Sequence, residues 1–311
     1  MASALPGGRT LHDAGPEAWS AAFAQVASVG FSLAELSDSH IRPADLSSAQ
    51  RAELRSAAAE WGVSLPAIHV QRQSVIEPRR GERNLEYSHR SIDAAAEMGM
   101  SVFSTGLHQP LSPAQRRALW FWTVDGPRDP VDDVETWNLA VHRLRQLGSH
   151  AAEVGMRVSL ELYEDTYLGT ADSAVRLVEE IALDNVGLNP DVGNLIRLHR
   201  PVEDWREIYA KTLPYANYWH VKNYSRDEAG DGSWASSSPS TLEAGLIDYR
   251  RVLQDAVAGG FDGIILCEQY GGDSLGVCAT NQQYIRGVLA AGEFSGATSV
   301  RYASTAAKGT K

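Results

Sequence analysis

Residues 158–170 read VSLELYEDTYLGT, a short apolar alternation that ends in acidic residues. Apolar residues occupy every second position of its first half, which is the period of a β-strand. Glu161 lies inside the alternation, and Glu164 and Asp165 follow at its end. Because a strand ordinarily ends in a turn residue, these three acids indicate either a solvated loop or a site that needs negative charge.

Short β-branched runs and amphipathic helices alternate along the rest of the chain. The predicted strands are residues 31–36, 64–70, 101–106, 157–163, 186–191, 216–222 and 263–268, with an eighth expected around Arg9–His12. The predicted helices are residues 16–28, 47–61, 84–98, 134–154, 171–183, 202–212, 248–258 and 276–290. Strands that alternate with helices pair in parallel through right-handed crossovers, and eight such units close into a (β/α)8 barrel. An open doubly wound sheet is the rival fold, but no glycine-rich phosphate-binding motif follows any strand.

The composition and charge limit the class of protein. The 311 residues are 43% hydrophobic and 22% charged, with a formal net charge of −11. General nucleic-acid and membrane-surface binders need a positive field, so we expect neither kind of partner. The sequence shows no apolar run that could span a bilayer and no secretory signal. Two cysteines, Cys267 and Cys278, suit a reducing compartment, so we expect a cytoplasmic protein.

The alternation predicts one domain, a barrel over residues 1–291, followed by a disordered tail over residues 292–311. Two connections, residues 107–133 and 223–246, are longer than ordinary βα loops. Long loops in compact domains are usually functional or disordered. Both leave the C-terminal ends of strands, where barrel enzymes place their sites.

Four predicted strands end on strong metal ligands, which are Glu161, Asp191, His220 and Glu268. Taken alone, each acid reads as a helix cap or a solvated charge, and the histidine reads as a structural residue. Four such residues on successive strands of one barrel can instead converge on a single cation. Three carboxylates and one imidazole suit Mn2+, Mg2+, Co2+ or Fe2+ better than a thiolate-rich structural zinc site. The pattern therefore predicts a divalent-cation site.

Two of these ligands lie in longer motifs, NVGLNPDVGN (185–194) and HVKNYSR (220–226). With the order Glu…Asp…His…Glu, they resemble the xylose-isomerase-like TIM barrels of the sugar isomerase/epimerase superfamily, over roughly residues 16–290. In its sugar 3-epimerase branch the resemblance implies that Glu161 and Glu268 also act as paired acid and base. It likewise implies that Arg226, six residues after the histidine, holds the substrate.

Two positions depart from the 3-epimerase pattern. Asn194 stands where that branch has a histidine, and Asn223 stands where it has an acid. These substitutions weaken the case for a ketose 3-epimerase in particular.

Longer stretches resemble another branch of the same superfamily. Residues 160–181, 218–228 and 267–274 are similar to the large subunits of bacterial C-glycoside deglycosidases. That resemblance implies an Mn2+-dependent lyase that removes a proton next to the ketone of a 3-keto C-glycoside and expels the aglycone. It also implies a small β-subunit and a higher oligomer. The alternative is a cofactor-independent sugar isomerase or epimerase, because both chemistries begin with the same proton abstraction.

Residues outside the four ligands would decide between these outcomes. His108 is a candidate base or proton donor to a leaving aglycone, or else a surface histidine. Lys222 shares a strand face with His220 and could hold a substrate oxygen. His69 could reach a sugar hydroxyl, or be a core histidine. Glu164 is expected to be solvated rather than to orient a ligand.

An aromatic cluster containing Trp120 and Trp122 lies within the long connection 107–133. It predicts either a local core beneath that loop or a wall on which a flat aglycone stacks. A metal-dependent endonuclease on the same fold is a third class, but it needs a basic DNA track that a chain of net charge −11 disfavours.

Overall fold

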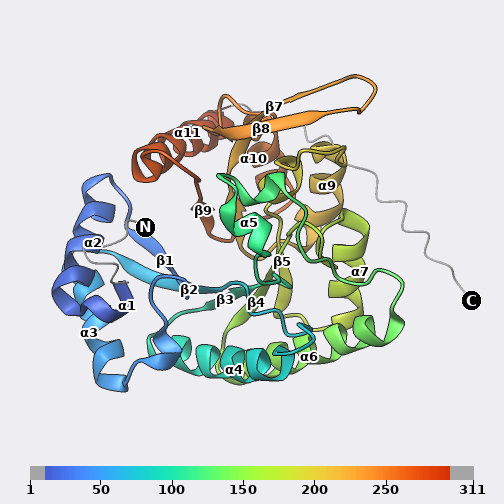
Figure 1. The fold of residues 1–311 in the computed structure, drawn as a ribbon. Coiled ribbons are helices and arrows are strands. Elements are labelled where there is room, and N and C mark those ends of the chain that lie inside the picture. Colours follow the sequence, from blue (N-terminus) through green and yellow to red (C-terminus); the bar gives the residue numbers. More distant parts are fainter. Residues whose placement is uncertain (1–10, 295–311) are drawn as a thin grey trace, which may run out of the picture.

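The computed structural model describes residues 11–294 and builds them into a barrel of parallel strands surrounded by helices (Figure 1). Within that part of the chain the barrel strands are β1 (Leu33–Ser37), β2 (Ser64–Val70), β3 (Val102–Thr105), β4 (Arg157–Glu161), β5 (Val186–Asn189), β6 (Trp219–Val221) and β9 (Ile265–Cys267). Each lies within a run that the alternation predicts, apart from small shifts at the ends.

The barrel strands whose pairing the structure gives run in parallel. Strands β1 to β5 form one sheet in sequence order, and β6 pairs with β9. A parallel bridge from Leu188 to Ala216 joins β5 to the segment that leads into β6. Because the strands run the same way, their C-terminal ends gather at one mouth of the barrel, where polar side chains can meet.

The helices pack around the strands. They are α1 (Leu11–Ala14), α2 (Pro16–Ser28), α3 (Ser48–Ala59), α4 (Gly81–Glu97), α5 (Pro113–Arg117), α6 (Val134–Glu153), α7 (Ala171–Ile181), α8 (Gly193–Ile196), α9 (Trp205–Thr212), α10 (Tyr249–Ala258) and α11 (Ser274–Phe294). The capping box that starts α3 joins Ser47 and Gln50, as the sequence predicts. On α6 the apolar stripe is buried against the sheet, so helical spacing determines which face contacts the core.

A small apolar cluster fills the barrel interior. Ala67 on β2, Val102 on β3 and Tyr218 before β6 are buried against one another. Ala67 and Val102 lie on neighbouring strands, and Tyr218 reaches them from a segment that pairs with neither strand, so side chains meet in the interior. The candidate ligands lie above this layer, at the C-terminal mouth.

One prediction about the N-terminal end of the chain is wrong within the described residues, and the predicted domain boundary at 291 stays a prediction. Leu11 and His12 of the expected eighth strand begin α1 instead, while Arg9 and Thr10 lie outside the described residues. Leu11 is buried, and its carbonyl accepts the indole N–H of Trp19, which fixes this segment against α2. Helix α11 continues to Phe294, so the expected barrel boundary at 291 falls inside a helix. The remainder of the expected tail, residues 295–311, lies outside the described part.

Both long connections contain structure of their own. Residues 223–246 include an antiparallel hairpin of β7 (Asn223–Glu228) and β8 (Ala235–Ser240), which extends from the barrel in Figure 1. Residues 107–133 include α5 and a 3-10 turn, η2 (Phe121–Thr123), and bury Trp122. None of the helices in residues 11–294 is long and apolar enough to cross a membrane.

Candidate metal centre

The four predicted ligands meet at the C-terminal mouth of the barrel. Nδ1 of His220 lies 3.6 Å from Oε1 of Glu161, 3.9 Å from Oδ2 of Asp191 and 3.5 Å from Oε2 of Glu268. One ligand atom from each residue lies within 4.8 Å of the others. The parallel strands produce this arrangement because Glu161 ends β4, Asp191 follows β5, His220 lies in β6 and Glu268 follows β9.

The buried polar atoms of this cluster fit a divalent cation. Oδ1 of Asp191 and Nδ1 of His220 are buried and have no hydrogen-bond partner among the described residues. The other oxygen of the Asp191 carboxylate accepts from Lys222, so Oδ1 of Asp191 and Nδ1 of His220 are the atoms whose lone pairs a cation could still accept. Carboxylate oxygens with one imidazole are the donor set of Mg2+, Mn2+ and Co2+ sites. Their role as ligands stays a prediction, now with the expected geometry.

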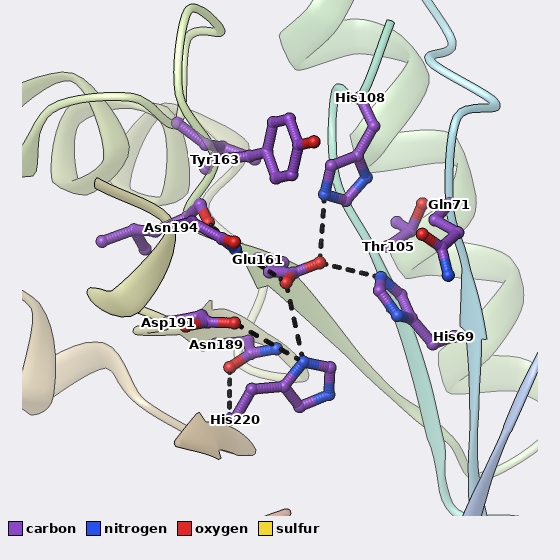
Figure 2. Close-up of polar contacts among 12 residues, drawn as sticks. His69, Gln71, Thr105, His108, Glu161, Tyr163, Asn189, Asp191, Asn194 and His220 are labelled. Carbon is purple, nitrogen blue, oxygen red and sulfur yellow. Dashed lines mark hydrogen bonds and ion pairs between the residues drawn. The ribbon is translucent and has the colours of Figure 1, made fainter. Parts of the chain in front are cut away.

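Hydrogen bonds orient the imidazole of His220 toward the other three ligands, of which Figure 2 shows Glu161 and Asp191. Its backbone N–H donates to Oδ1 of Asn189 at 2.7 Å, and its Nε2 lies 3.1 Å from Oε2 of Glu35. That carboxylate also accepts a hydrogen bond from the hydroxyl of Tyr218 at 2.9 Å. A carboxylate behind a metal-ligating histidine fixes the tautomer and leaves the other ring nitrogen free for the metal. Glu35 is not among the residues predicted from the sequence, although its position inside a predicted strand is a usable signal.

Two further histidines hold the other oxygen of Glu161 (Figure 2). Nε2 of His69 lies 2.8 Å from Oε2 of Glu161, and Nε2 of His108 lies 3.0 Å from the same oxygen. All three side chains are buried, and they form a second group with metal-ligand spacing. His69 and His108, both candidates from the sequence, are thus brought to the centre.

The two histidines differ in their electrostatic environment. Burial lowers the pKa of His108 to about 4 in spite of the neighbouring Glu161 carboxylate. Burial also opposes charge on His69, but Glu161 and Glu35 together outweigh it and raise its pKa. The pKa of Glu161 is held well below its usual range, because His69 and His108 outweigh its own burial. At neutral pH His108 is therefore a neutral imidazole beside a carboxylate that stays ionised.

Lys222 binds two of the candidate ligand residues. Its Nζ donates to Oε2 of Glu268 at 2.8 Å and to Oδ2 of Asp191. Burial disfavours the charged ammonium, but Asp191 and Glu268 outweigh that effect and raise the pKa of Lys222. Burial raises the pKa of Asp191 to about 8 even though Lys222 lowers it. The ammonium and a metal ion would therefore share carboxylate oxygens.

Asn194 occupies the position where the 3-epimerase motif has a histidine. Its Nδ2 donates to Oε1 of Glu161 and to the carbonyl of Leu162, both at 2.9 Å. The side chain therefore orients the carboxylate of Glu161, and a substrate contact from this position would have to compete with those two hydrogen bonds.

The aromatic residues of the connection 107–133 lie over the barrel mouth. Trp120 and Trp122 are stacked with ring centroids 4.9 Å apart, and Trp122 also contacts Tyr270 in the loop after β9. The ring of Tyr163 meets His108 edge to face at 4.2 Å. These rings contact residues beside the centre, since Tyr163 meets His108 and Tyr270 lies near Lys222, and a stacking role toward substrate stays a prediction.

Two charged residues lie in surroundings that the sequence does not reveal. The expectation that Glu164 is solvated is wrong, since it is buried and both its oxygens accept from Nη2 of Arg197 at 2.9 Å. Arg226 donates to the carbonyls of Ile196, Leu198 and Arg200, which follow β5. It thus clamps backbone in this structure, and its expected contact with substrate stays a prediction.

The model of the xylose isomerase-like TIM barrel family matches residues 23–289 of this sequence. The chain belongs to this family. A xylose isomerase-like TIM barrel protein from Mycobacterium smegmatis, solved in complex with magnesium, is 42% identical and has a TM-score of 0.87. That match covers 92% of this chain and 93% of the other.

Two further relatives of this xylose isomerase-like barrel are more distant. D-psicose 3-epimerase from Clostridium cellulolyticum H10, solved with D-tagatose, is 18% identical over 89% of this chain and 92% of that chain. Its TM-score of 0.60 shows a shared fold. Inosose dehydratase from Geobacillus thermodenitrificans (strain NG80-2) is 27% identical over 152 residues, 45% of this chain and 49% of the relative. The match thus spans about half the length of that curated relative.

Proposed function

We propose that this xylose isomerase-like barrel is a divalent-cation-dependent enzyme that removes the proton next to the ketone of a keto-sugar. The convergence of Glu161, Asp191, His220 and Glu268 on one point carries this proposal, because their atoms lie within 4.8 Å of one another. We assign Mn2+ as the cation, with Mg2+ or Co2+ as alternatives. The magnesium in the 42% identical relative supports a hard divalent ion.

The bound cation would polarise the substrate carbonyl and so make the neighbouring C–H more acidic. Proton transfer itself falls to the side chains of this chain. Glu161 and Glu268 are the candidate acid and base, and His108, 3.0 Å from Glu161, is placed to pass a proton onward. General acid–base help of this kind contributes about 10²–10⁴-fold in rate. Lys222, already charged, can donate a hydrogen bond to a substrate oxygen once that oxygen displaces one of its carboxylate partners.

Loss of a leaving group is the outcome that we favour, in the form of cleavage of a 3-keto C-glycoside. The motifs shared with C-glycoside deglycosidases support it, and so does similarity to a protein named inosose dehydratase, since a dehydratase also expels a group by elimination. The rings of Trp120 and Trp122 would then stack on the aglycone, at about 0.5–1.5 kcal/mol per good pair.

Isomerisation or epimerisation is the second candidate, and one observation favours it. Carboxylate oxygens of Glu161 and Glu268 lie 3.6 Å and 3.5 Å from the same nitrogen of His220. When two carboxyl groups lie close to the same position, one can remove a proton from a bound substrate carbon and the other can return a proton to it.

One experiment separates the two outcomes. The Mn2+-loaded protein is incubated in D2O with a 3-keto C-glycoside, with and without a small partner subunit, and the products are analysed by mass spectrometry and NMR. Free aglycone supports the lyase, and deuterium in an unbroken sugar supports the isomerase. If neither product forms although the cation is shown to be bound, the result contradicts both proposed reactions.

A further inference from the structure

Arg197 is a fully buried arginine that the proposed reaction does not use. It directly follows α8 and has 0% exposed surface. Its Nη2 contacts both oxygens of Glu164 at 2.9 Å. Burial opposes the charge, but Glu164 and the surrounding tyrosine hydroxyls outweigh it, so the pKa of Arg197 is raised and the guanidinium stays charged.

The rest of this guanidinium has no carboxylate or carbonyl acceptor, and the hydroxyl of Tyr224 is the neutral oxygen that interacts with it. Nε and Nη1 of Arg197 are buried and form no hydrogen bond with any residue in the range 11–294. Its central carbon lies 4.8–5.4 Å from the ring centroids of four aromatic residues, which are Phe121, Trp122, Tyr163 and Tyr270. Ring faces attract the charge but offer no lone pair in the plane of the N–H groups. A buried donor without an acceptor costs about 1–3 kcal/mol and calls for a missing partner.

More unpaired donors lie in the same cluster. The indole nitrogen of Trp122 and the hydroxyl of Tyr224 are buried and donate no hydrogen bond to a described residue, although the Tyr224 oxygen interacts with Arg197, and the two rings are 5.5 Å apart. Several donors that share one buried region and lack acceptors indicate an absent group rich in oxygen.

This cluster adjoins the metal centre on two sides. Tyr163 contacts Arg197 and also meets the ring of His108, which lies 3.0 Å from Glu161. Tyr270 contacts Arg197, and its ring centroid lies 5.6 Å from Nζ of Lys222. Tyr163 and Tyr270 therefore each contact both Arg197 and a residue of the centre.

The charged residues of the cluster carry a net positive charge that one negative group would neutralise. Arg72 lies 5.0 Å from the same Phe121 ring and donates from Nη2 to the hydroxyl of Tyr163 at 2.8 Å. Arg72 has no carboxylate partner within 4.0 Å in the described part of the chain. Arg72, Arg197 and Glu164 together carry one net positive charge, which a single oxyanion would neutralise.

We propose that Arg197 binds an oxyanion of the substrate through Nε and Nη1, while Glu164 holds the guanidinium in place. The oxyanion is a carboxylate on the sugar or a phenolate on the aglycone. A narrow crevice of about 20 Å3, lined in part by Arg72, Tyr163 and Glu164, lies beside the cluster. This inference rests on the proposed function only in taking the ligand to be a sugar derivative.

The test measures binding rather than turnover. Titration calorimetry at constant ionic strength compares methyl β-D-glucuronide with methyl β-D-glucoside, which differ only in the carboxylate, and adds 4-nitrophenolate as the phenolate probe. Each probe is titrated with Mg2+ and after removal of metal by chelation, because a carboxylate could also bind the cation. We expect one oxyanion probe to bind at least about tenfold more tightly than the glucoside, with or without Mg2+.

The variants assign that preference to a residue. Arg197→Lys keeps the charge opposite Glu164 but loses the paired donors, and is expected to lose most of the preference while glucoside binding stays unchanged. Should it fail to fold, the double variant Arg197→Gln with Glu164→Gln removes both buried charges together. Arg51→Lys is the matched control, since Arg51 donates to backbone carbonyls of the distant segment 43–46.

Equal affinity of the wild-type protein for all three probes would overturn the inference, and so would an oxyanion preference that survives loss of Arg197. If the preference depends on Arg197 but no keto-glycoside is turned over, this inference stands and the proposed function fails. If a keto-glycoside is turned over but no oxyanion preference is found, the proposed function stands and this inference fails.

Discussion

Nε2 of His220 donates a hydrogen bond to Oε2 of Glu35 at 3.1 Å, although 185 positions separate the two residues in the chain. Strand β1 supplies the carboxylate and β6 the imidazole, and the curvature of the barrel brings them together. This bond directs Nδ1 of His220 toward Glu161, Asp191 and Glu268.

The Glu35→Gln substitution should therefore weaken cation binding without removing a ligand. Loss of a carboxylate behind a ligating histidine typically costs 10–100-fold, so we expect about that decrease in Mg2+ affinity by titration calorimetry. Glu53→Gln, on an exposed position of α3, is the matched control and should bind as the wild type does. Unchanged affinity in Glu35→Gln would show that His220 needs no such orientation.

Direct loss of a metal ligand should reduce cation affinity more than the loss of Glu35 does. Glu161→Gln and Glu268→Gln each remove a charged oxygen from the centre, so both should lose metal in elemental analysis and lose α-proton exchange with solvent. Each variant should lose at least as much affinity as Glu35→Gln. If both retained metal and turnover, the site would lie elsewhere.

The Lys222→Met substitution should separate metal binding from catalysis. The ammonium contacts Oδ2 of Asp191 and Oε2 of Glu268, so its removal frees both oxygens for a cation. We expect Mg2+ affinity to rise by about tenfold, or ~1.4 kcal/mol, while turnover falls because a donor to the substrate is lost. A clear decrease in affinity would instead mean that Lys222 supports the ligand geometry.

Asp129 should make stability depend on pH, away from the metal centre. Burial raises its pKa from 3.8 to about 6, although hydrogen bonds from Gln109 and Tyr167 act in the opposite direction. Between these two values the folded chain holds more protons than the unfolded chain, so the free energy of unfolding decreases as pH rises.

Asp129→Asn lacks this titration, so its stability relative to wild type should increase by up to about 3 kcal/mol between pH 4 and pH 7. Gln109 can turn its amide to suit the new side chain. Urea unfolding at both pH values measures the difference. A difference that is the same at pH 4 and pH 7 would show that Asp129 titrates normally.

The sequence predicts the barrel and its four candidate ligands for a common reason. Strand alternation and helical spacing are local patterns, and in a parallel barrel every strand end faces one mouth, so residues such as Glu161 and Asp191 can be placed together without coordinates. The eighth strand at Arg9–His12 has weak alternation, and the structure begins a helix at Leu11.

Residue type, order and spacing along the chain were enough to determine the fold class, the family resemblance and the acids and histidine at the strand ends. Only the tertiary structure decided that Glu35 supports His220, that Glu164 is buried against Arg197 and that Arg226 clamps backbone carbonyls. Each of these depends on a partner far away in the sequence, and no local pattern encodes such a partner. Burial makes each of these contacts energetically important, because an ionised group shielded from water must find its counter-charge or hydrogen-bond donor within the protein.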